Sequence, residues 1–420
     1  MPAKTSPEGE RLEEADARRQ AWRKWGPYVS ERQWGTVRED YSADGDAWNY
    51  LPHEHARSRA YRWGEDGIGG FCDAKQNLCV AVALWNGKDP ILKERMFGLS
   101  NREGNHGEDV KELYYYLDAV PTYSYARMLY KYPQAEFPYD LLVQENARRD
   151  RHQPEFEIID TGIFDADRYF DVDIEYAKAG ADDILLQLTI NNRGPDEAAI
   201  HVLPQVWFRN TWSWVTDGPK PSLERAGDDV VVKHEKLGAY AIHFDRPDEI
   251  KFCENETNVA KLYGSEETGH LYKDGFHDYL VGGHKHAVGS HKGTKAAGIY
   301  RRTVAAGDST TIRVRLSLGP PQPAPFADFE QIFGLRKSEA DAFYAELQAK
   351  VLDEDLRRIQ RQAFAGVLWS KQYFYYDVTE WLDGDPAEPK PPKSRRKGRN
   401  CEWVHATMED IVSMPDKWEF

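Results

Sequence analysis

The sequence predicts a mainly β protein with some α-helix: a large antiparallel β-sandwich followed by a helical region. Apolar and polar residues alternate with a period of two through much of residues 78–318. The proline-rich segment GPPQPAP at 319–325 interrupts this pattern, and beyond it apolar residues recur with a helical period. We therefore divide the chain into an N-terminal helix (1–27), a β-sandwich domain (28–318), a linker (319–325) and a helical region (326–420).

The first predicted helix covers residues 8–25. Acidic residues lead it and basic residues follow, as the helix dipole favours, and Gly26-Pro27 would end it. Leu12, Ala15, Trp22 and Trp25 fall on roughly one side. We expect that side to dock on the main body.

The predicted strands alternate between a buried and a solvated face, which is typical of antiparallel sheets. Turn-forming segments such as NNRGPDE (191–197) and AAGDS (305–309) separate them. The candidates are residues 78–85, 112–118, 155–160, 170–176, 186–190, 199–209, 229–235, 238–244, 297–304 and 312–318. So many strands at this spacing predict a large sandwich.

Three helices are predicted after the linker, at residues 326–334, 338–350 and 355–375. Ser338, with Asp341 three residues later, resembles a capping box at the start of the second helix. The third carries a broad apolar stripe that includes Ile359, Phe364 and Val367. A polar, proline-rich and basic loop follows at 383–399.

Length and composition describe a folded protein of about two domains. The chain has 420 residues and a formal net charge of −15, so no basic excess is present to neutralise phosphates, and we expect neutral ligands and no nucleic-acid partner. No signal peptide or membrane-spanning run is visible, which predicts a cytoplasmic protein without a membrane partner. The four cysteines form no CxxC pair, and we expect them to be reduced.

An aromatic-rich stretch from Trp22 to Tyr116 interleaves six tryptophans with arginines and acids. Such a composition suits an irregular interface between domains or a surface that stacks against sugar rings. We favour the structural role for these aromatics.

Two groups of histidines have metal-ligand residue types. His53, Glu54 and His55 could converge with His106, Glu108 and Asp109, and HxH on a strand would point both rings the same way. A glycine-rich segment at 275–293 holds His277, His284, His286 and His291 but matches no phosphate-binding pattern. We interpret the first group as hydrogen-bonding partners and the second as an exposed loop, and we expect no metal and no cofactor.

Aromatic and charged residues near the C-terminal end suit carbohydrate, because sugar C–H faces stack on aromatic rings and sugar hydroxyls pair with polar side chains. The predicted substrate-binding residues are Trp369, Lys371, Gln372, Tyr373, Trp403, Asp416, Lys417 and Trp418, with His405 beside Trp403.

Several long strings carry a resemblance to a known family. They include WGPYVSERQWGTVREDYSADGDAW (25–48), PHEHARSRAYRWGEDGIGGFCD (52–73), LWNGKDPILKERMFGLSNREGNHGEDVKELYYYLD (84–118), LPQVWFRNTWSW (203–214) and GRNCEWVHATMEDIVSMPDKWEF (398–420). The chain resembles the amino-terminal part of bacterial glucosidases of glycoside hydrolase family 63, which are similar to mannosylglycerate hydrolase.

This resemblance implies a β-sandwich followed by the first helices of an (α/α)6 barrel, from an inverting glycosidase. The substrates would be α-glucosides or compounds like mannosylglycerate and glucosylglycerate. The family's acid and base would lie beyond Phe420, so no catalytic residue is assigned and the 420-residue chain is expected to be inactive alone.

The alternative is a non-catalytic carbohydrate-binding or scaffold module. If the rest of a barrel lies downstream, the apolar stripe at Ile359, Phe364, Val367 and Leu368 should be partly uncovered or should pack against the sandwich.

Overall fold

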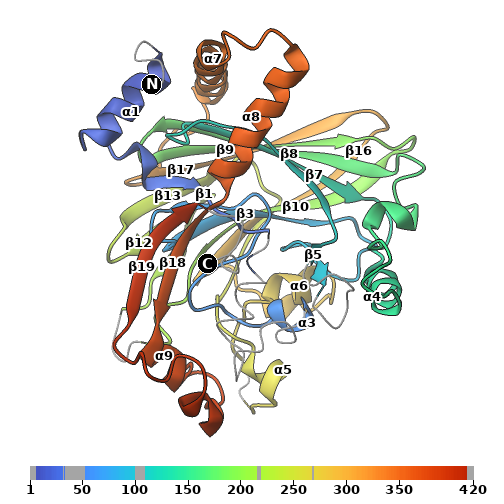
Figure 1. The fold of residues 1–420 in the computed structure, drawn as a ribbon, viewed down its shortest axis with the longest axis vertical. Coiled ribbons are helices and arrows are strands. Elements are labelled where there is room, and N and C mark those ends of the chain that lie inside the picture. The colour runs from blue at the N-terminus through green and yellow to red at the C-terminus, as the bar shows by residue number, and fades with distance from the viewer. Residues whose placement is uncertain are drawn as a thin grey trace.

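Two antiparallel β-sheets packed face to face form the body of the protein (Figure 1). The computed structural model describes residues 6–31, 33, 53–99, 109–214, 219–266 and 269–413. The smaller sheet has the order β1-β2-β3-β10-β16-β14 and the larger has the order β15-β11-β12-β13-β17-β9-β8-β7-β6. The predicted β-sandwich is thereby confirmed.

The strands of the six-stranded sheet are β1 (Trp25–Pro27), β2 (Phe71–Asp73), β3 (Leu78–Trp85), β10 (Ala198–Phe208), β16 (Lys295–Val304) and β14 (Glu249–Cys253). The strands of the nine-stranded sheet are β15 (Lys292–Gly293), β11 (Ser222–Ala226), β12 (Asp229–His234), β13 (Gly238–Phe244), β17 (Ser309–Leu318), β9 (Asp183–Asn192), β8 (Tyr169–Gly180), β7 (Tyr125–Pro133) and β6 (Leu113–Ala119). A short pair, β4 (Gly98–Leu99) and β5 (Asp109–Val110), lies outside both sheets.

The main core lies between the two sheets. Val82 and Val202 from the smaller sheet and Ile174 and Leu188 from the larger one belong to a single buried cluster. Apolar residues two apart in sequence point to the same face of a strand, so this core is the direct product of the period-two pattern.

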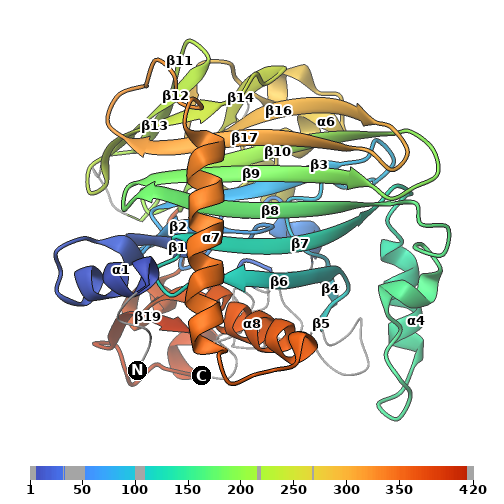
Figure 2. The same cartoon turned by 90° about the horizontal axis from the view of Figure 1, so that it is seen from above.

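Helices cover the outer face of the nine-stranded sheet. Helix α7 (Phe329–Leu347) lies across its strands (Figure 2), and Phe329 and Phe343 pack in one cluster with Leu185. Helix α1 (Pro7–Asp16) contacts α7 and places the buried Glu8 against the turn between β6 and β7, where its carboxylate accepts hydrogen bonds from the Thr122 backbone and hydroxyl. The N-terminal helix therefore docks on the main body, as expected, but its buried residues are Glu8, Gly9 and Arg11, whereas Leu12 and Ala15 of the predicted side are only partly buried.

The remaining short helices lie in loops. They are η1 (Trp22–Lys24), α3 (His53–Ala56), α4 (Tyr139–Arg148), η3 (Ile158–Thr161), α5 (Val259–Tyr263), α6 (Gly275–Leu280) and η4 (Lys285–Ala287). Residues 155–160 were predicted as a strand and instead lead into η3, where Glu157 and Asp160 form a capping box. The N-terminal helix ends at Asp16, earlier than predicted, and Gly26-Pro27 belongs to β1.

The helical region after the linker differs from the prediction in two ways. One continuous helix, α7, replaces the two predicted at 326–334 and 338–350, and the Ser338 hydroxyl donates to the Leu335 carbonyl within that helix rather than capping a new one. Helix α8 (Glu354–Trp369) ends six residues before the predicted boundary. Residues beyond it form β18 (Lys371–Asp377), which pairs with β19 (Thr407–Ser413).

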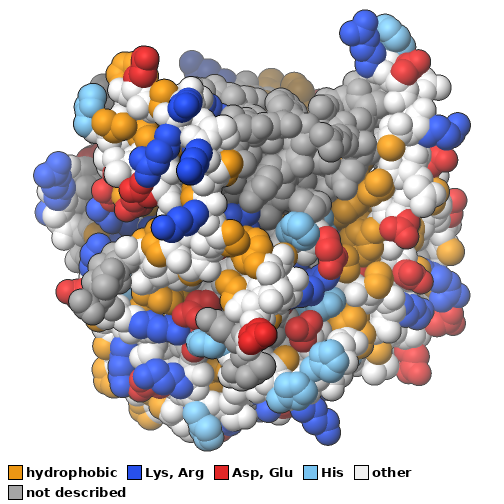
Figure 3. Space-filling view, turned by 90° about the horizontal axis from the view of Figure 1, so that it is seen from below, with side chains coloured by type: hydrophobic (Ala, Val, Ile, Leu, Met, Phe, Trp, Pro, Cys, Tyr) orange, Lys and Arg blue, Asp and Glu red, His pale blue; other side chains and the backbone are white. Residues whose placement is uncertain are grey.

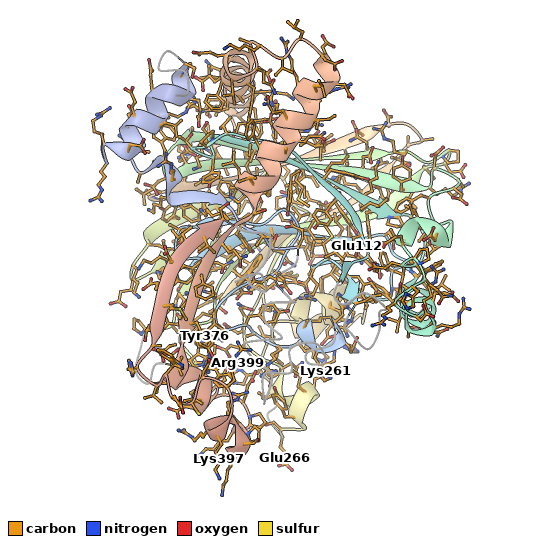
Figure 4. The ribbon with its side chains drawn as sticks, in the orientation of Figure 1. Glu112, Lys261, Glu266, Tyr376, Lys397 and Arg399 are labelled. Carbon is orange, nitrogen blue, oxygen red and sulfur yellow. The ribbon has the colours of Figure 1, made fainter. Side chains whose placement is uncertain are left out.

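The β18–β19 hairpin extends from the end of α8 to the far end of the molecule (Figure 1). Helix α9 (Val378–Asp383) and the turn η5 (Lys393–Lys397) lie between its strands in sequence. Tyr376, marked in Figure 4 close to this end, accepts a hydrogen bond from the Asn400 side-chain amide at 2.8 Å. Tyr376 and Trp381 also pack in one cluster with Trp63 from the aromatic-rich stretch.

Helix α8 buries one face and exposes an apolar stripe on another. Trp369 is fully buried in the main core, whereas Ile359 and Val367 are 55% and 61% exposed and Phe364 is 38% exposed. The predicted partial exposure of this stripe is confirmed.

Within the described ranges, no helix combines the length and the apolar character that crossing a bilayer requires.

Candidate functional site

A groove of about 480 Å³ lies where the β18–β19 hairpin meets the sandwich. Strand β18 contributes Tyr373 and Tyr375, β19 contributes Glu409, and α9 contributes Glu380. The opposite side comes from the sandwich. Its residues are Arg62, Lys75, Asn77, Arg209, Thr211, Trp212, Trp214, Pro219, Pro221, His234, Glu235 and Lys236.

Aromatic rings form much of the groove wall. Tyr373 and Tyr375 are two positions apart on β18 and therefore face the same side, with ring centroids 6.3 Å apart and planes 6° apart. Trp63 packs behind Tyr375 at 5.4 Å. Trp212 and Trp214 follow β10 and line the sandwich side. Flat aromatic faces at the edge of an open groove suit stacking against a ligand ring.

Two carboxylates from the hairpin region have different environments. Glu409 accepts from the Tyr373 hydroxyl at 3.1 Å and from Lys75 at 2.7 Å, and these partners lower its pKa. Burial raises the pKa of Glu380 against the opposing effect of Arg62. Within the described part of the chain, burial and longer-range charges act on the Glu380 carboxylate but no hydrogen bond does, which leaves it available to a ligand hydroxyl.

His234 presents a neutral donor to the groove. Its Nδ1 accepts from the backbone N–H groups of Lys236 and Leu237 at 3.1 and 3.2 Å, so the ring proton lies on Nε2. Burial lowers the pKa of His234, which keeps the ring neutral at physiological pH. The groove thus combines stacking faces, a carboxylate acceptor and fixed N–H donors.

A second hollow of about 440 Å³ lies on the other side of the loop that follows β10. Thr211, Trp212 and Trp214 line the groove, whereas Asn210 and Ser213 line this second hollow, so the loop is the wall between the two. The hollow is lined on the far side by residues 385–389.

Two carboxylates face each other in that second hollow. The Glu388 carboxylate is held by Arg59 and accepts from the Thr257 hydroxyl at 3.2 Å. Burial and the neighbouring Glu388 raise the pKa of Asp385 to about 6. The Arg59–Glu388 pair joins the aromatic-rich stretch to the loop after α9, so we interpret it as structural.

A closed network of charges lies beneath the sandwich's smaller sheet. Arg95 Nε donates to Asp66 Oδ2 at 2.8 Å, and Lys295 Nζ donates to Glu94 Oε1 at 2.7 Å. Glu65, Asp66, Glu94, Arg95, Lys273 and Lys295 are all at most 5% exposed and surround a space of about 10 Å³. Room for no more than a water molecule makes this network structural.

Another buried pair supports the same structural reading of the aromatic-rich stretch. Glu112, at the centre of Figure 4, accepts from Lys93 at 2.6 Å and from the Tyr130 hydroxyl at 2.7 Å. Trp25 and Trp63 are at most 1% exposed. The described parts of the stretch hold buried charge pairs and aromatic rings, in line with the structural role favoured from sequence. Trp34 and Trp48 lie outside the described residues.

The predicted substrate-binding residues lie in different places. Trp369 is fully buried, stacks on Tyr116 at 5.3 Å and donates to the Asp118 carbonyl. Lys371 and Gln372 are also buried, at 6% and 2% exposure. Their neighbour Tyr373 lines the groove.

The other predicted residues are not brought to the groove within the described chain. Trp403 is 62% exposed, and His405 beside it is also exposed. Asp416, Lys417 and Trp418 lie outside the described residues.

The described histidines of the two predicted groups lie on different elements. His53 and His55 lie on the short helix α3 rather than on a strand, and His53 packs against Phe97 at 5.2 Å. His106 and Glu108 lie outside the described residues. His277 is on α6, where its Nδ1 accepts from the Leu92 N–H, so part of the predicted exposed loop is helical.

No grouping of three potential metal ligands occurs in the part of the chain that the structure covers. Figure 3 shows Lys and Arg side chains over several parts of this face, with a denser group at its upper left. Exposed Lys393, Arg396 and Lys397 of η5 belong to the basic loop predicted there.

Sequence reasoning missed most of the groove. Trp212 and Trp214 lie in a string that the family resemblance had marked, but nothing in the spacing linked them to Tyr373. The usable signal was the density of tryptophan and arginine directly after a strand, since loops that follow strands commonly carry binding residues.

Comparisons with known proteins give one strong sequence relative. A Saccharomyces cerevisiae protein, named as uncharacterized protein YMR196W, is 42% identical over 464 aligned positions, which cover 98% of this chain and 42% of that protein. The chain therefore spans less than half the length of the relative it matches. No protein-family model matches the chain.

Solved structures give only distant matches. A kojibiose phosphorylase from the human microbiome has a TM-score of 0.23 at 8% identity, covering 80% of this chain and 39% of that one. A family GH92 α-mannosidase from Bacteroides thetaiotaomicron has a TM-score of 0.29 at 10% identity, covering 85% and 39%. Scores this low decide neither fold nor function.

Proposed function

We propose that the groove between the β18–β19 hairpin and the sandwich binds carbohydrate, and that the chain is the amino-terminal part of an inverting glycoside hydrolase. The observation that carries the proposal is the pairing of a stacking face with polar groups: the partly exposed ring of Tyr375 on one side, and Glu380 and the His234 N–H within the same groove. A sugar needs such a combination, because one face of its ring is apolar and its rim carries hydroxyls.

The finer assignment rests on the resemblance to glycoside hydrolase family 63. It makes the substrate an α-glucoside or a compound like mannosylglycerate or glucosylglycerate. The exposed stripe of α8, with Ile359 and Val367 more than half exposed, supports a longer helical region packing there, such as the remainder of a barrel. The yeast relative, more than twice as long as its aligned part, supports the same proposal.

Binding to the 420-residue chain tests the groove directly. Ligand-observed NMR and calorimetry with maltose, glucosylglycerate and mannosylglycerate should detect at least one ligand. Tyr375→Ala should weaken that binding, because a lost aromatic contact is worth about 1 kcal/mol, or roughly fivefold in Kd.

A matched control is available on another surface. Tyr115 is 45% exposed on β6 and does not line the groove, so Tyr115→Ala removes the same side chain without touching it. Equal loss of affinity in both variants, or no binding by the unmodified chain, would overturn the groove assignment.

Activity tests the enzyme assignment. The 420-residue chain should not hydrolyse these glycosides, whereas a downstream-extended protein should hydrolyse one and release the β-anomer first, since inversion needs both an acid and a base. An initial α-anomer in the NMR spectrum of fresh product would exclude inversion.

The alternative function is a non-catalytic carbohydrate-binding or scaffold module. The groove has a stacking face and polar groups among the described residues and needs no catalytic acid or base to bind a sugar, which is the observation that favours this alternative. This alternative is favoured if the 420-residue chain binds a sugar but the downstream-extended protein hydrolyses none of the three glycosides.

A further inference from the structure

Two buried arginine side chains line the groove and are held there by backbone oxygens. Arg62 and Arg209 are 5% and 7% exposed. Arg62 Nη1 donates to the Glu380 carbonyl at 2.7 Å, and Arg209 Nη1 donates to the Arg62 carbonyl at 2.8 Å. The other Arg209 nitrogens reach the carbonyls of Gln76 and Lys75 at 3.3 and 3.4 Å.

The same two guanidinium groups also lie over the faces of aromatic rings. The Arg62 guanidinium lies 5.0 Å from the Trp63 ring centre and 4.9 Å from that of Trp214. The Arg209 guanidinium lies 5.1 Å from the Tyr373 ring centre. Carbonyl dipoles and aromatic faces orient a cation and stabilise it, but they carry no net negative charge.

The two guanidinium groups differ from other buried arginines in the ion pairs that the described residues provide. Among the described residues, no carboxylate oxygen lies within 4.0 Å of either guanidinium, and Arg62 Nε is buried without an acceptor. Other buried arginines here are neutralised: Arg95 is paired with Asp66, and Arg315 is paired with Asp183. Carbonyls and aromatic rings leave the net positive charge of these two side chains unneutralised among the described residues, so an anion that enters the groove would be stabilised there.

The acids that line the groove do not fill this role. Glu409 is already paired with Lys75 and bonded to Tyr373, and Glu235 is exposed at the rim. Burial raises the pKa of Glu380, although longer-range attraction to Arg62 and Arg209 acts to lower it. Lys236 adds a further exposed cation to the same lining.

We propose that the floor of this groove is an anion-binding site, and that the ligand is a sugar derivative carrying a carboxylate or a phosphate. Arg62, Arg209 and Lys236 supply electrostatic attraction, and the His234 Nε2–H supplies a neutral hydrogen bond. The partly exposed ring of Tyr375 then stacks against the sugar ring. This inference rests on the proposed function for the sugar part, and stands independently of it for the anion.

Calorimetry with four named probes tests the site: glucose, glucuronate, glucose 6-phosphate and inorganic phosphate. The charged sugars should bind at least about tenfold more tightly than glucose at low salt, because charge-assisted hydrogen bonds are roughly twice as strong as neutral ones. That preference should shrink as NaCl is raised. The carboxylate and phosphate arms show which oxyanion the site prefers.

Arg62→Met should reduce the preference for charged sugars to near unity. The matched control is Arg148→Met, since the Arg148 side chain is 71% exposed and does not line the groove. Arg62→Lys keeps the charge and should retain part of the preference, so it separates loss of charge from loss of packing if Arg62→Met folds poorly.

The outcomes also separate this inference from carbohydrate binding itself. Phosphate binding that requires Arg62, without binding of any sugar, supports the anion site and overturns the sugar proposal. Equal binding of glucose and both charged sugars, or a preference that survives in Arg62→Met and Arg62→Lys alike, overturns the anion site.

Discussion

The protein holds arginines in two contrasting interiors. In the closed network, Arg95 lies against Asp66, Lys295 lies against Glu94, and the enclosed space is about 10 Å³. In the groove, Arg62 and Arg209 are almost as buried, yet their partners are carbonyls and aromatic rings beside about 480 Å³ of open volume.

The difference teaches how to separate structural from functional charge. A network whose acids and bases balance internally needs nothing from solvent and is expected to serve stability or fold specificity. A buried cation that no described acid neutralises can bind an anion when it lies next to open volume. Burial alone would have classed the two interiors together.

The largest expected effect comes from the closed network. Arg95→Met leaves Asp66 buried without its main counter-charge, and removing one partner of a buried pair typically costs about 3–5 kcal/mol of unfolding free energy. Urea unfolding followed by circular dichroism measures this. Arg62→Met should cost clearly less, because no carboxylate is orphaned in the groove. Equal losses would remove the distinction between the two interiors.

The closed network should also respond to pH through Glu65. Burial raises the pKa of Glu65 to about 7 from its usual 4.5. Between these values the folded protein keeps a proton that the unfolded chain has released, so stability falls as pH rises, by up to about 1.4 kcal/mol per unit. The contribution is complete below the unfolded pKa and is lost as pH passes the folded one.

Glu65→Gln is the variant that isolates this contribution, because glutamine cannot ionise. Unfolding free energies of both proteins at pH 5, 6 and 7 should diverge in slope, with the wild type losing more on going from pH 5 to pH 7. Parallel curves would show that Glu65 does not titrate in this range.

The sandwich could be predicted from sequence because period-two patterning is a local signal. Residues 78–85 and 238–244 were predicted with the bounds that β3 and β13 have. Residues 155–160 misled the prediction, since Glu157 and Asp160 bond each other's backbone N–H groups in a capping box and so favour a turn.

The boundary between α8 and β18 was missed for a different reason. No Gly or Pro lies between Trp369, where the helix ends, and the aromatic residues at 373–376, so no stop signal was visible. Their strand conformation comes from pairing with β19, more than thirty residues away. Tertiary pairing of this kind overrides local propensity.

The groove was largely beyond sequence analysis for the same reason. Tyr373 was predicted as a binding residue, but its partners Arg209 and Trp214 come from the end of another strand. The burial of Trp369 was also not predictable from its neighbours in sequence. Both Trp369 and Val367 belong to an apolar run on the helix, yet the first is buried and the second is exposed.

The smallest expected effect concerns the rim of the groove. Lys75 and Glu409 form an ion pair whose side chains are 61% and 42% exposed, and exposed pairs are worth about 0–1 kcal/mol. Lys75→Met should therefore change the unfolding free energy by less than about 1 kcal/mol, well below the effect of Arg95→Met. Affinity for glucose 6-phosphate should fall only about two- to threefold, because an exposed cation acts through screened, longer-range attraction. Calorimetry at low and high NaCl checks this: the difference between Lys75→Met and wild type should vanish at high salt, whereas the loss in Arg62→Met should persist. A salt-independent loss in Lys75→Met would instead place Lys75 in direct contact with the anion and would move the site from the groove floor to its rim.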